Sequence, residues 1–227
     1  MFYEYKHGGT GDYYVKEYGI NFVFPPHLHN SFEFITALSG SITVTIDGKK
    51  HTLSKGWGVL IFPNQLHSIT STESEHMLCI FSPELVNSFT SHVKNSLPKS
   101  NLFSPGEEII SKLNEHSQDI DLITKKALLY SLCATFNKTA TYQPATREST
   151  DLLSTIFAFV ENNYQTDCTL KQLAQAIGYD YAYLSKYFKR TTGICFSHYL
   201  NQFRLSRARY LLSSTDITIV QWALDVG

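Results

Sequence analysis

The spacing of hydrophobic positions divides the chain into a strand-rich first part and a helical remainder. Residues Ile42 to Ile46 (ITVTI) alternate apolar residues with Thr, which is the two-residue period of a strand with one buried face. Asp47-Gly48 follows directly and predicts a tight hairpin turn. The segments FEFITAL, GVLIF and MLCIF predict further strands, with Gly40, Gly56 and Pro63 between them. Many short strands without a helical period predict a small sandwich or barrel.

The middle of the chain changes to a helical pattern. Ser-Pro followed by early acidic residues predicts helix starts near Pro83 and Pro105. The segment from Ile123 to Phe136 is apolar on a wide face, so this helix buries two faces. One face packs on its own domain, and the other packs either on the same core or on a second copy of the chain. Residues 137–150 then lose the apolar period and predict a linker.

The last part of the chain has the pattern of a helix-turn-helix. Thr169 and Gln172 have the spacing of a capping box, which predicts a helix start. Gly178 predicts the end of that helix, and a second helix follows from about Tyr181. Ala174, Gly178 and Leu184 then occupy the three positions where a helix-turn-helix needs a small residue, a turn residue and an apolar residue.

Charge supports an interaction with nucleic acid in this part of the chain. The 227 residues carry a formal net charge of −1, which alone indicates no partner. Between Tyr181 and Thr215, however, there is no acidic residue, and the basic residues are Lys186, Lys189, Arg190, Arg204, Arg207 and Arg209. On a helix-turn-helix pattern such a run favours DNA over a solvated helix face.

Cysteine spacing and the N-terminus bear on the compartment. Cys79, Cys133, Cys168 and Cys195 form no CxxC pair, which argues against a zinc ribbon or a dithiol redox motif. The N-terminus has no signal-peptide core, and no apolar run is long enough to span a membrane. We therefore expect a soluble cytoplasmic protein with no membrane partner.

A polar constellation lies in the strand-rich part. His27, His29 and Glu33 fall within seven residues, and His67 follows another predicted strand. On a strand, His27 and His29 would share one face. Imidazoles and a carboxylate are ligands for a first-row metal ion, but they also line pockets or simply hydrogen-bond at a barrel mouth. We expect these four residues to bind a ligand and expect no cofactor, with a divalent metal ion at the same residues as the alternative.

Two stretches resemble known families. The pattern His27-x-His29-x3-Glu33-x6-Gly40, then Gly56-x6-Pro63-x3-His67, resembles the two cupin motifs, although Gln65 replaces a common glycine and Ser71 a common asparagine. LAQAIGYDYAYLSKYFKRTTG, with the following YL…R…A..LL, resembles the AraC/XylS family of transcriptional regulators. TLKQLAQAIG (residues 169–178) also aligns without gaps to TIVQWALDVG (residues 218–227), as expected for the family's two helix-turn-helix units.

The resemblance implies an α+β multidomain fold. We expect a cupin-like sensor barrel over residues 1–82, a helical dimerisation segment over 83–140, a linker over 141–150, and an all-α helix-turn-helix domain over 151–227. It also implies a homodimer through the helix near Ile123–Phe136, a small-molecule effector such as a sugar in the barrel, and double-stranded promoter DNA as the partner.

The resemblance assigns DNA contacts to the second helix of the first unit. Ala182, Ser185 and Lys186 are expected to face base edges. Tyr181, Lys189 and Arg190 are expected to contact phosphates or the groove wall.

The sequence stops at Gly227, inside the second unit as the family has it. We therefore expect Trp222 and Val226 to be partly exposed, and DNA binding to be weak with a shallow salt dependence. The leading hypothesis is a ligand-responsive transcription regulator without enzyme activity. The alternatives are a metal-dependent cupin enzyme, such as a dioxygenase or isomerase, and a truncated sensor fragment that acts through heterodimers.

Overall fold

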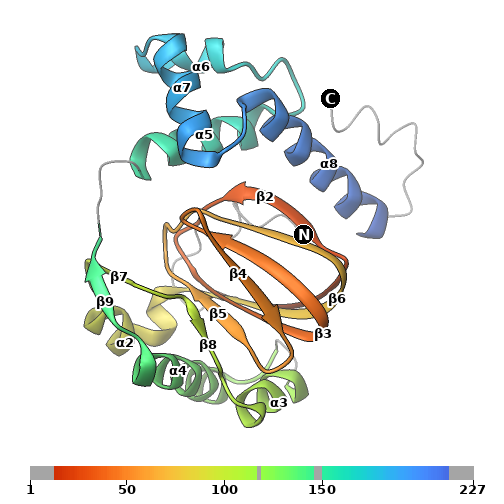
Figure 1. Ribbon diagram of the computed structural model, residues 1–227, viewed down its shortest axis with the longest axis vertical. Helices are drawn as coiled ribbons and strands as arrows, with labels where there is room; N and C mark the ends of the chain where they lie inside the picture. The colour runs from red at the N-terminus through yellow and green to blue at the C-terminus, as the bar shows by residue number, and fades with distance from the viewer. Residues whose placement is uncertain (1–12, 117–118, 146–149, 215–227) are drawn as a thin grey trace. The chain divides into compact units, whose positions relative to one another are not determined.

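The computed structural model describes residues 13–116, 119–145 and 150–214 (Figure 1). The chain forms two compact units, and the main division between them falls between Thr146 and Arg147. No helix in the described part is long and apolar enough to cross a membrane. The repeat at residues 218–227, with Trp222 and Val226, lies outside the described residues.

The first unit is built on a seven-stranded sheet that curves around an interior (Figure 1). Its strands are β1 (Tyr14–Ile20), β2 (Val23–His27), β3 (Phe32–Ile46), β4 (Lys49–Ser54), β5 (Gly58–Ile61), β6 (His67–Phe81) and β8 (Leu102–Phe103). The main path is β1-β6-β3-β5-β8, while β2 pairs with β6 and β4 with β3. The predicted barrel-like fold is confirmed.

One long strand replaces two shorter ones that the sequence predicts. The segments FEFITAL and ITVTI form one strand, β3, because Gly40 does not end it. Gly40 instead has a φ of +65° between two irregularities of the β3–β6 pairing, where any side chain would overlap the carbonyl oxygen of Glu73. The predicted hairpin is confirmed, with Asp47 and Gly48 at φ of 47° and 80° between β3 and β4.

The outer face of the sheet packs against helices. Phe32 and Phe34 of β3, Leu60 of β5 and Cys79 of β6 belong to one buried cluster with residues of α4. The helices of this unit are η1 (Pro83–Val86), α2 (Asn87–His92), α3 (Glu107–Glu115) and α4 (Leu122–Thr139). Because side chains alternate along a strand, Glu33, Ile35 and Ile61 face the opposite side, the barrel interior.

Residues 137–144, where the loss of the apolar period indicates a linker, form secondary structure in part. Helix α4 continues to Thr139, and Tyr142–Pro144 forms strand β9, which pairs antiparallel with β7 (Ser96–Pro98). Tyr142 packs against the buried cluster and donates a 2.7 Å hydrogen bond to Asn137. This tertiary pairing orders a segment that has no apolar period of its own.

The second unit contains α5 (Thr150–Asn163), α6 (Leu170–Ile177), α7 (Tyr181–Thr192) and α8 (Phe196–Ser214). Its core includes Phe157, Leu184 and Tyr199, with the Phe157 and Tyr199 rings stacked at 5.0 Å. The predicted capping box at Thr169 is confirmed, and Gly178 ends α6 in the left-handed conformation. Buried Ala174 and Leu184 hold α6 and α7 in the helix-turn-helix arrangement.

Candidate functional site

The structure brings the four predicted polar residues of the barrel together. His27 ends β2, His29 lies in the connection between β2 and β3, Glu33 is the second residue of β3 and His67 begins β6. All four are buried, and their ligand atoms lie within 4.8 Å of one another. His27 and His29 do not share a strand face, because β2 ends at His27 before the chain turns. We call His27, His29, Glu33 and His67 the four-residue cluster.

Backbone carbonyls orient the histidine rings of this cluster. The Nδ1 atoms of His27 and His67 each donate a 2.9 Å hydrogen bond, to the carbonyl oxygens of Pro25 and Gln65. A carbonyl oxygen only accepts, so Nδ1 carries the proton in both rings. The Nε2 atoms are then the ligand atoms of these two rings. Such a second contact fixes ring orientation and raises the basicity of a ligating histidine.

Glu33 is the anionic centre of the cluster. Its Oε2 atom lies 2.8 Å from Nε2 of His29 and 3.2 Å from Nε2 of His67. Burial alone would raise the pKa of Glu33, but His67 and His29 together hold it well below its usual range. Burial also lowers the pKa of His29, although Glu33 opposes that shift. Glu33 is therefore a buried carboxylate whose charge depends on these two imidazoles.

The cluster also has the chemistry of a metal site. Nε2 of His67 lies 3.2 Å from Oε2 of Glu33. Without a proton on either atom, the two would repel each other, so the contact requires a proton or a metal cation between His67 and Glu33. The other oxygen of Glu33, Oε1, is buried and has no hydrogen-bond partner in the described part of the chain. Three imidazoles and a carboxylate suit a divalent first-row ion, and His27, His29, Glu33 and His67 would hold it.

A fifth polar residue, His76, belongs to the barrel interior and to none of the sequence motifs. It lies on β6, is 3% exposed, and pairs in register with Gly19 of β1. A side chain at Gly19 would overlap the His76 ring, so the glycine makes room for it. Nδ1 of His76 is buried without a hydrogen-bond partner among the described residues. Burial lowers the pKa of His76, while Glu33 acts in the opposite direction. The sequence did contain a signal for His76: it alternates with Leu78 and Ile80 along the strand, and these two side chains face the interior.

In the second unit, α7 has one buried and one exposed face. Leu184, Tyr187 and Phe188 are buried in the unit. The predicted contact residues lie on the rest of the helix: Tyr181, Ala182, Lys186, Lys189 and Arg190 are exposed, and Ser185 is partly exposed. Asp180 caps the helix by accepting a 2.9 Å hydrogen bond from the backbone N–H of Tyr183.

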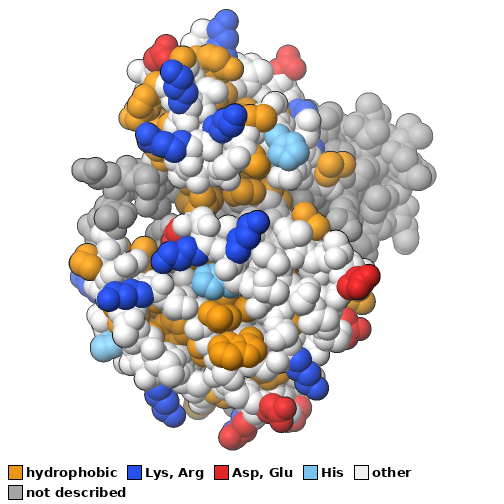
Figure 2. All heavy atoms as spheres, in the orientation of Figure 1, with side chains coloured by type: hydrophobic (Ala, Val, Ile, Leu, Met, Phe, Trp, Pro, Cys, Tyr) orange, Lys and Arg blue, Asp and Glu red, His pale blue; other side chains and the backbone are white. Residues whose placement is uncertain are grey.

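The predicted basic patch is smaller than the sequence count suggests. Arg204 donates to the carbonyl oxygens of Tyr164 and Thr166, at 2.8 and 2.9 Å, and so ties α8 to the connection before α6. The side chains of Arg207 and Arg209 lie outside the described residues. Lys186, Lys189 and Arg190 remain exposed on α7, and Figure 2 shows basic side chains (blue) on the α6–α7 part of this unit.

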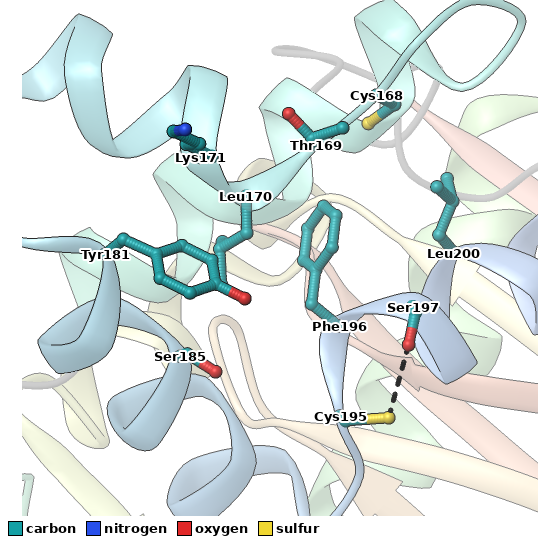
Figure 3. Close-up of a pocket in the computed structure, with 10 residues that line it drawn as sticks. All are labelled: Cys168, Thr169, Leu170, Lys171, Tyr181, Ser185, Cys195, Phe196, Ser197 and Leu200. Atoms are coloured by element: carbon teal, nitrogen blue, oxygen red, sulfur yellow. Dashed lines mark hydrogen bonds between the residues drawn. The ribbon is translucent and has the colours of Figure 1, made fainter.

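A hollow of about 500 Å³ adjoins the exposed face of α7. It is lined by the starts of α6 and α8, and Figure 3 shows Tyr181 and Ser185 of α7 pointing toward Phe196 of α8. Cys195 also lines it, and a hydrogen bond with Ser197 lowers the pKa of its thiol. The hollow therefore borders Ser185, one of the residues predicted to face bases.

Comparisons with known proteins agree with this division. Residues 16–82 match the cupin domain family, and residues 164–227 match a helix-turn-helix domain family. A transcriptional regulator of the helix-turn-helix type from Staphylococcus aureus is 32% identical over 77 residues, which are 34% of this chain but only 10% of that protein. The transcriptional activator RhaS of Escherichia fergusonii is 22% identical over 223 residues, 90% of this chain and 79% of RhaS.

Solved structures share the fold along nearly the whole chain. A variant of ToxT from Vibrio cholerae superposes with a TM-score of 0.61 at 16% identity, covering 94% of this chain and 88% of ToxT. Another ToxT structure, with a bound unsaturated fatty acid, gives a TM-score of 0.56 at 17% identity, covering 96% of this chain and 87% of ToxT. The chain therefore joins a cupin domain to a helix-turn-helix domain, and it is similar to a transcriptional activator over 90% of its length.

Proposed function

We propose that this chain is a ligand-responsive transcription regulator that binds promoter DNA through α6 and α7 and a small molecule in the barrel. The observation that carries the proposal is α7 itself, a capped helix with a buried apolar face and an exposed face of small and basic residues. A helix-turn-helix presents its second helix to the major groove in this way. We propose that it acts in the cytoplasm as a dimer.

The exposed face of α7 has residues suited to two kinds of contact. Lys186 can donate to guanine, Ser185 accepts or donates with any base, and Ala182 offers an apolar contact to a thymine methyl group. Tyr181, Lys189 and Arg190 supply hydroxyl and cationic groups for phosphates, which position the protein without reading sequence.

The barrel site is proposed to bind the effector through the four-residue cluster and His76. The family resemblance favours a sugar, whereas ToxT is known with an unsaturated fatty acid bound. The buried Glu33 carboxylate would repel a ligand carboxylate beside it. A hydroxyl-rich or cationic ligand, or a metal ion, would pair with it. We therefore propose a ligand that presents hydrogen-bond donors to Glu33.

DNA binding can be tested on sequences selected from a random pool. Lys186→Ala should weaken binding to the selected site by about 1–3 kcal/mol and relax the base preference at one position, because it removes a base contact. Lys189→Ala should weaken binding to all sequences alike and reduce the salt slope by about one, because it removes a phosphate contact. Fluorescence anisotropy at several salt concentrations measures both.

Lys112→Ala is the matched control, because Lys112 is an exposed lysine on α3 that pairs with Glu108. It should leave DNA binding unchanged. A chain that selects no sequence, or that binds equally well after both α7 substitutions, would contradict the proposal.

The four-residue cluster favours one second candidate, a metal-dependent cupin enzyme. A metal ion there would supply Lewis-acid chemistry to a bound substrate. Metal content per chain, measured without a His-tag for the wild type and for His29→Ala, separates the two. Stoichiometric metal that the variant loses, together with turnover of a substrate, would favour the enzyme; metal without turnover fits the regulator.

A further inference from the structure

Gln65 occupies a special position two residues before His67. Its side chain is 4% exposed, and its backbone carbonyl oxygen accepts the 2.9 Å hydrogen bond from Nδ1 of His67. The amide oxygen accepts from the backbone N–H of Phe62 at 2.9 Å, and the amide nitrogen donates to Asp47 at 2.8 Å. A glycine, common at this place in cupins, could make none of the side-chain bonds. Gln65 therefore anchors the turn that positions His67.

Asn101 continues this network away from the barrel interior. Its side chain is also buried, and its amide nitrogen donates to the amide oxygen of Gln65 at 2.6 Å and to the carbonyl oxygen of Leu60 at 2.7 Å. The backbone carbonyl oxygen of Asn101 accepts a hydrogen bond from the backbone N–H of Leu60 at 3.0 Å. Buried networks whose members are all paired hold one geometry, since any shift leaves a polar group without a partner.

The segment that carries Asn101 is bonded to the segment that leads to the second unit. Two residues earlier, the backbone N–H of Lys99 donates to the carbonyl oxygen of Thr141 at 2.8 Å. Strands β7 and β9 pair over three positions beside it, and the N–H of Ala145 donates to Asn95 at 2.9 Å. From Ala145 the chain passes through residues 146–149 to α5. The exit from the first unit is thus bonded to the strand that precedes Asn101.

We propose that the Gln65–Asn101 hydrogen bond couples the state of His67 to the β7–β9 strand pair, with Gln65 as the positioning residue for His67. A ligand that reorients His67 changes its bond to the Gln65 carbonyl. The turn cannot shift alone, because the Gln65 amide is also bonded to Asn101. The inference rests on the proposed function in one respect: it takes the four-residue cluster as the ligand site.

The test uses hydrogen exchange and needs neither effector nor DNA. The full chain is compared as wild type, His67→Ala, Asn101→Leu and the double variant. His67→Ala should speed exchange of the β7 and β9 amides about two- to thirtyfold, the range of energetic coupling between sites, while β1 changes less. In the Asn101→Leu background, His67→Ala should add no further acceleration at β7 and β9.

Asn114→Ala is the control, since Asn114 of α3 accepts a hydrogen bond from Tyr18 of β1, outside this network. Its effect should add to that of His67→Ala. The proposal is overturned if His67→Ala leaves β7 and β9 unchanged, or if its effect is undiminished without Asn101. Should Asn101→Leu not fold, Asn101→Ser removes the same contacts with less steric change. Failure here leaves the DNA-binding proposal intact, because the readout involves no DNA.

Discussion

A buried carboxylate between histidines makes the barrel sensitive to acid. Glu33 is ionised because His67 and His29 outweigh the effect of burial on its pKa. His29 is itself held neutral by burial, which lowers its pKa below 6.5. Both groups bind protons less readily in the folded state than in the unfolded state, so both make folding less favourable as pH falls.

The stability of metal-free protein should therefore decrease in two windows of pH. Below about pH 6.5, His29 takes up a proton in the unfolded chain more readily than in the folded chain, so the folded state loses stability. The contribution of Glu33 is complete above the unfolded pKa near 4.5 and is lost as pH falls through its lower folded value. The free energy of unfolding of Glu33→Gln should be about 1–3 kcal/mol lower than that of the wild type at neutral pH, and it should decline less below about pH 4.5.

Urea unfolding in the presence of a chelator, repeated across this pH range, measures both effects. An acid decline in Glu33→Gln as steep as that of the wild type would contradict the assignment of the lower window to Glu33.

The residues of the barrel site were predictable from the sequence where they belong to a motif with a defined spacing. The spacing of His27, His29, Glu33 and His67 predicted the set that the fold brings together. His76 was not predicted, because its place in the interior depends on Gly19 across the sheet. The role of Arg204 was also hidden, since a count of charges does not show which cations bond to carbonyl oxygens.

At the scale of elements, Gly40 allows β3 to pass β6 without a break. Its φ is +65°, and any Cβ would overlap the carbonyl oxygen of Glu73. Gly40→Ala should destabilise the chain by about 3 kcal/mol or more, because backbone overlap adds to left-handed strain. Gly56→Ala should cost only about 1–2 kcal/mol, since Gly56 has a φ of +88° but open space around it.

Urea midpoints of the two variants give this comparison directly. Equal losses would mean that the β3–β6 pairing can move aside at Gly40.

The local signals of the chain were predictable, as the Asp47-Gly48 turn and the Thr169 capping box show. The continuity of β3 and the strand β9 were not, because both depend on partner strands far away in the sequence.

At the scale of the whole molecule, α4 has one buried face and one exposed face. Leu129, Leu132, Cys133 and Phe136 are buried in the first unit. A second stripe at helical spacing stays exposed, formed by Ile123, Ala127, Ser131 and Ala134. Ile123 is 82% exposed, which leaves a large apolar side chain in water. We propose that this stripe is the contact between two copies, because small residues let two helices approach closely.

Replacing Ile123 should therefore weaken the proposed dimer. In a two-fold interface each substitution acts twice, and a buried isoleucine contributes about 1.5–3 kcal/mol relative to an exposed one. Ile123→Asp should raise the dissociation constant at least about tenfold, since 1.4 kcal/mol corresponds to one decade. Ile20→Asp is the matched control, because Ile20 is 70% exposed and lies on β1 rather than on α4. Sedimentation velocity over a dilution series measures both; if the two variants dissociate at the same concentration, α4 is not the contact.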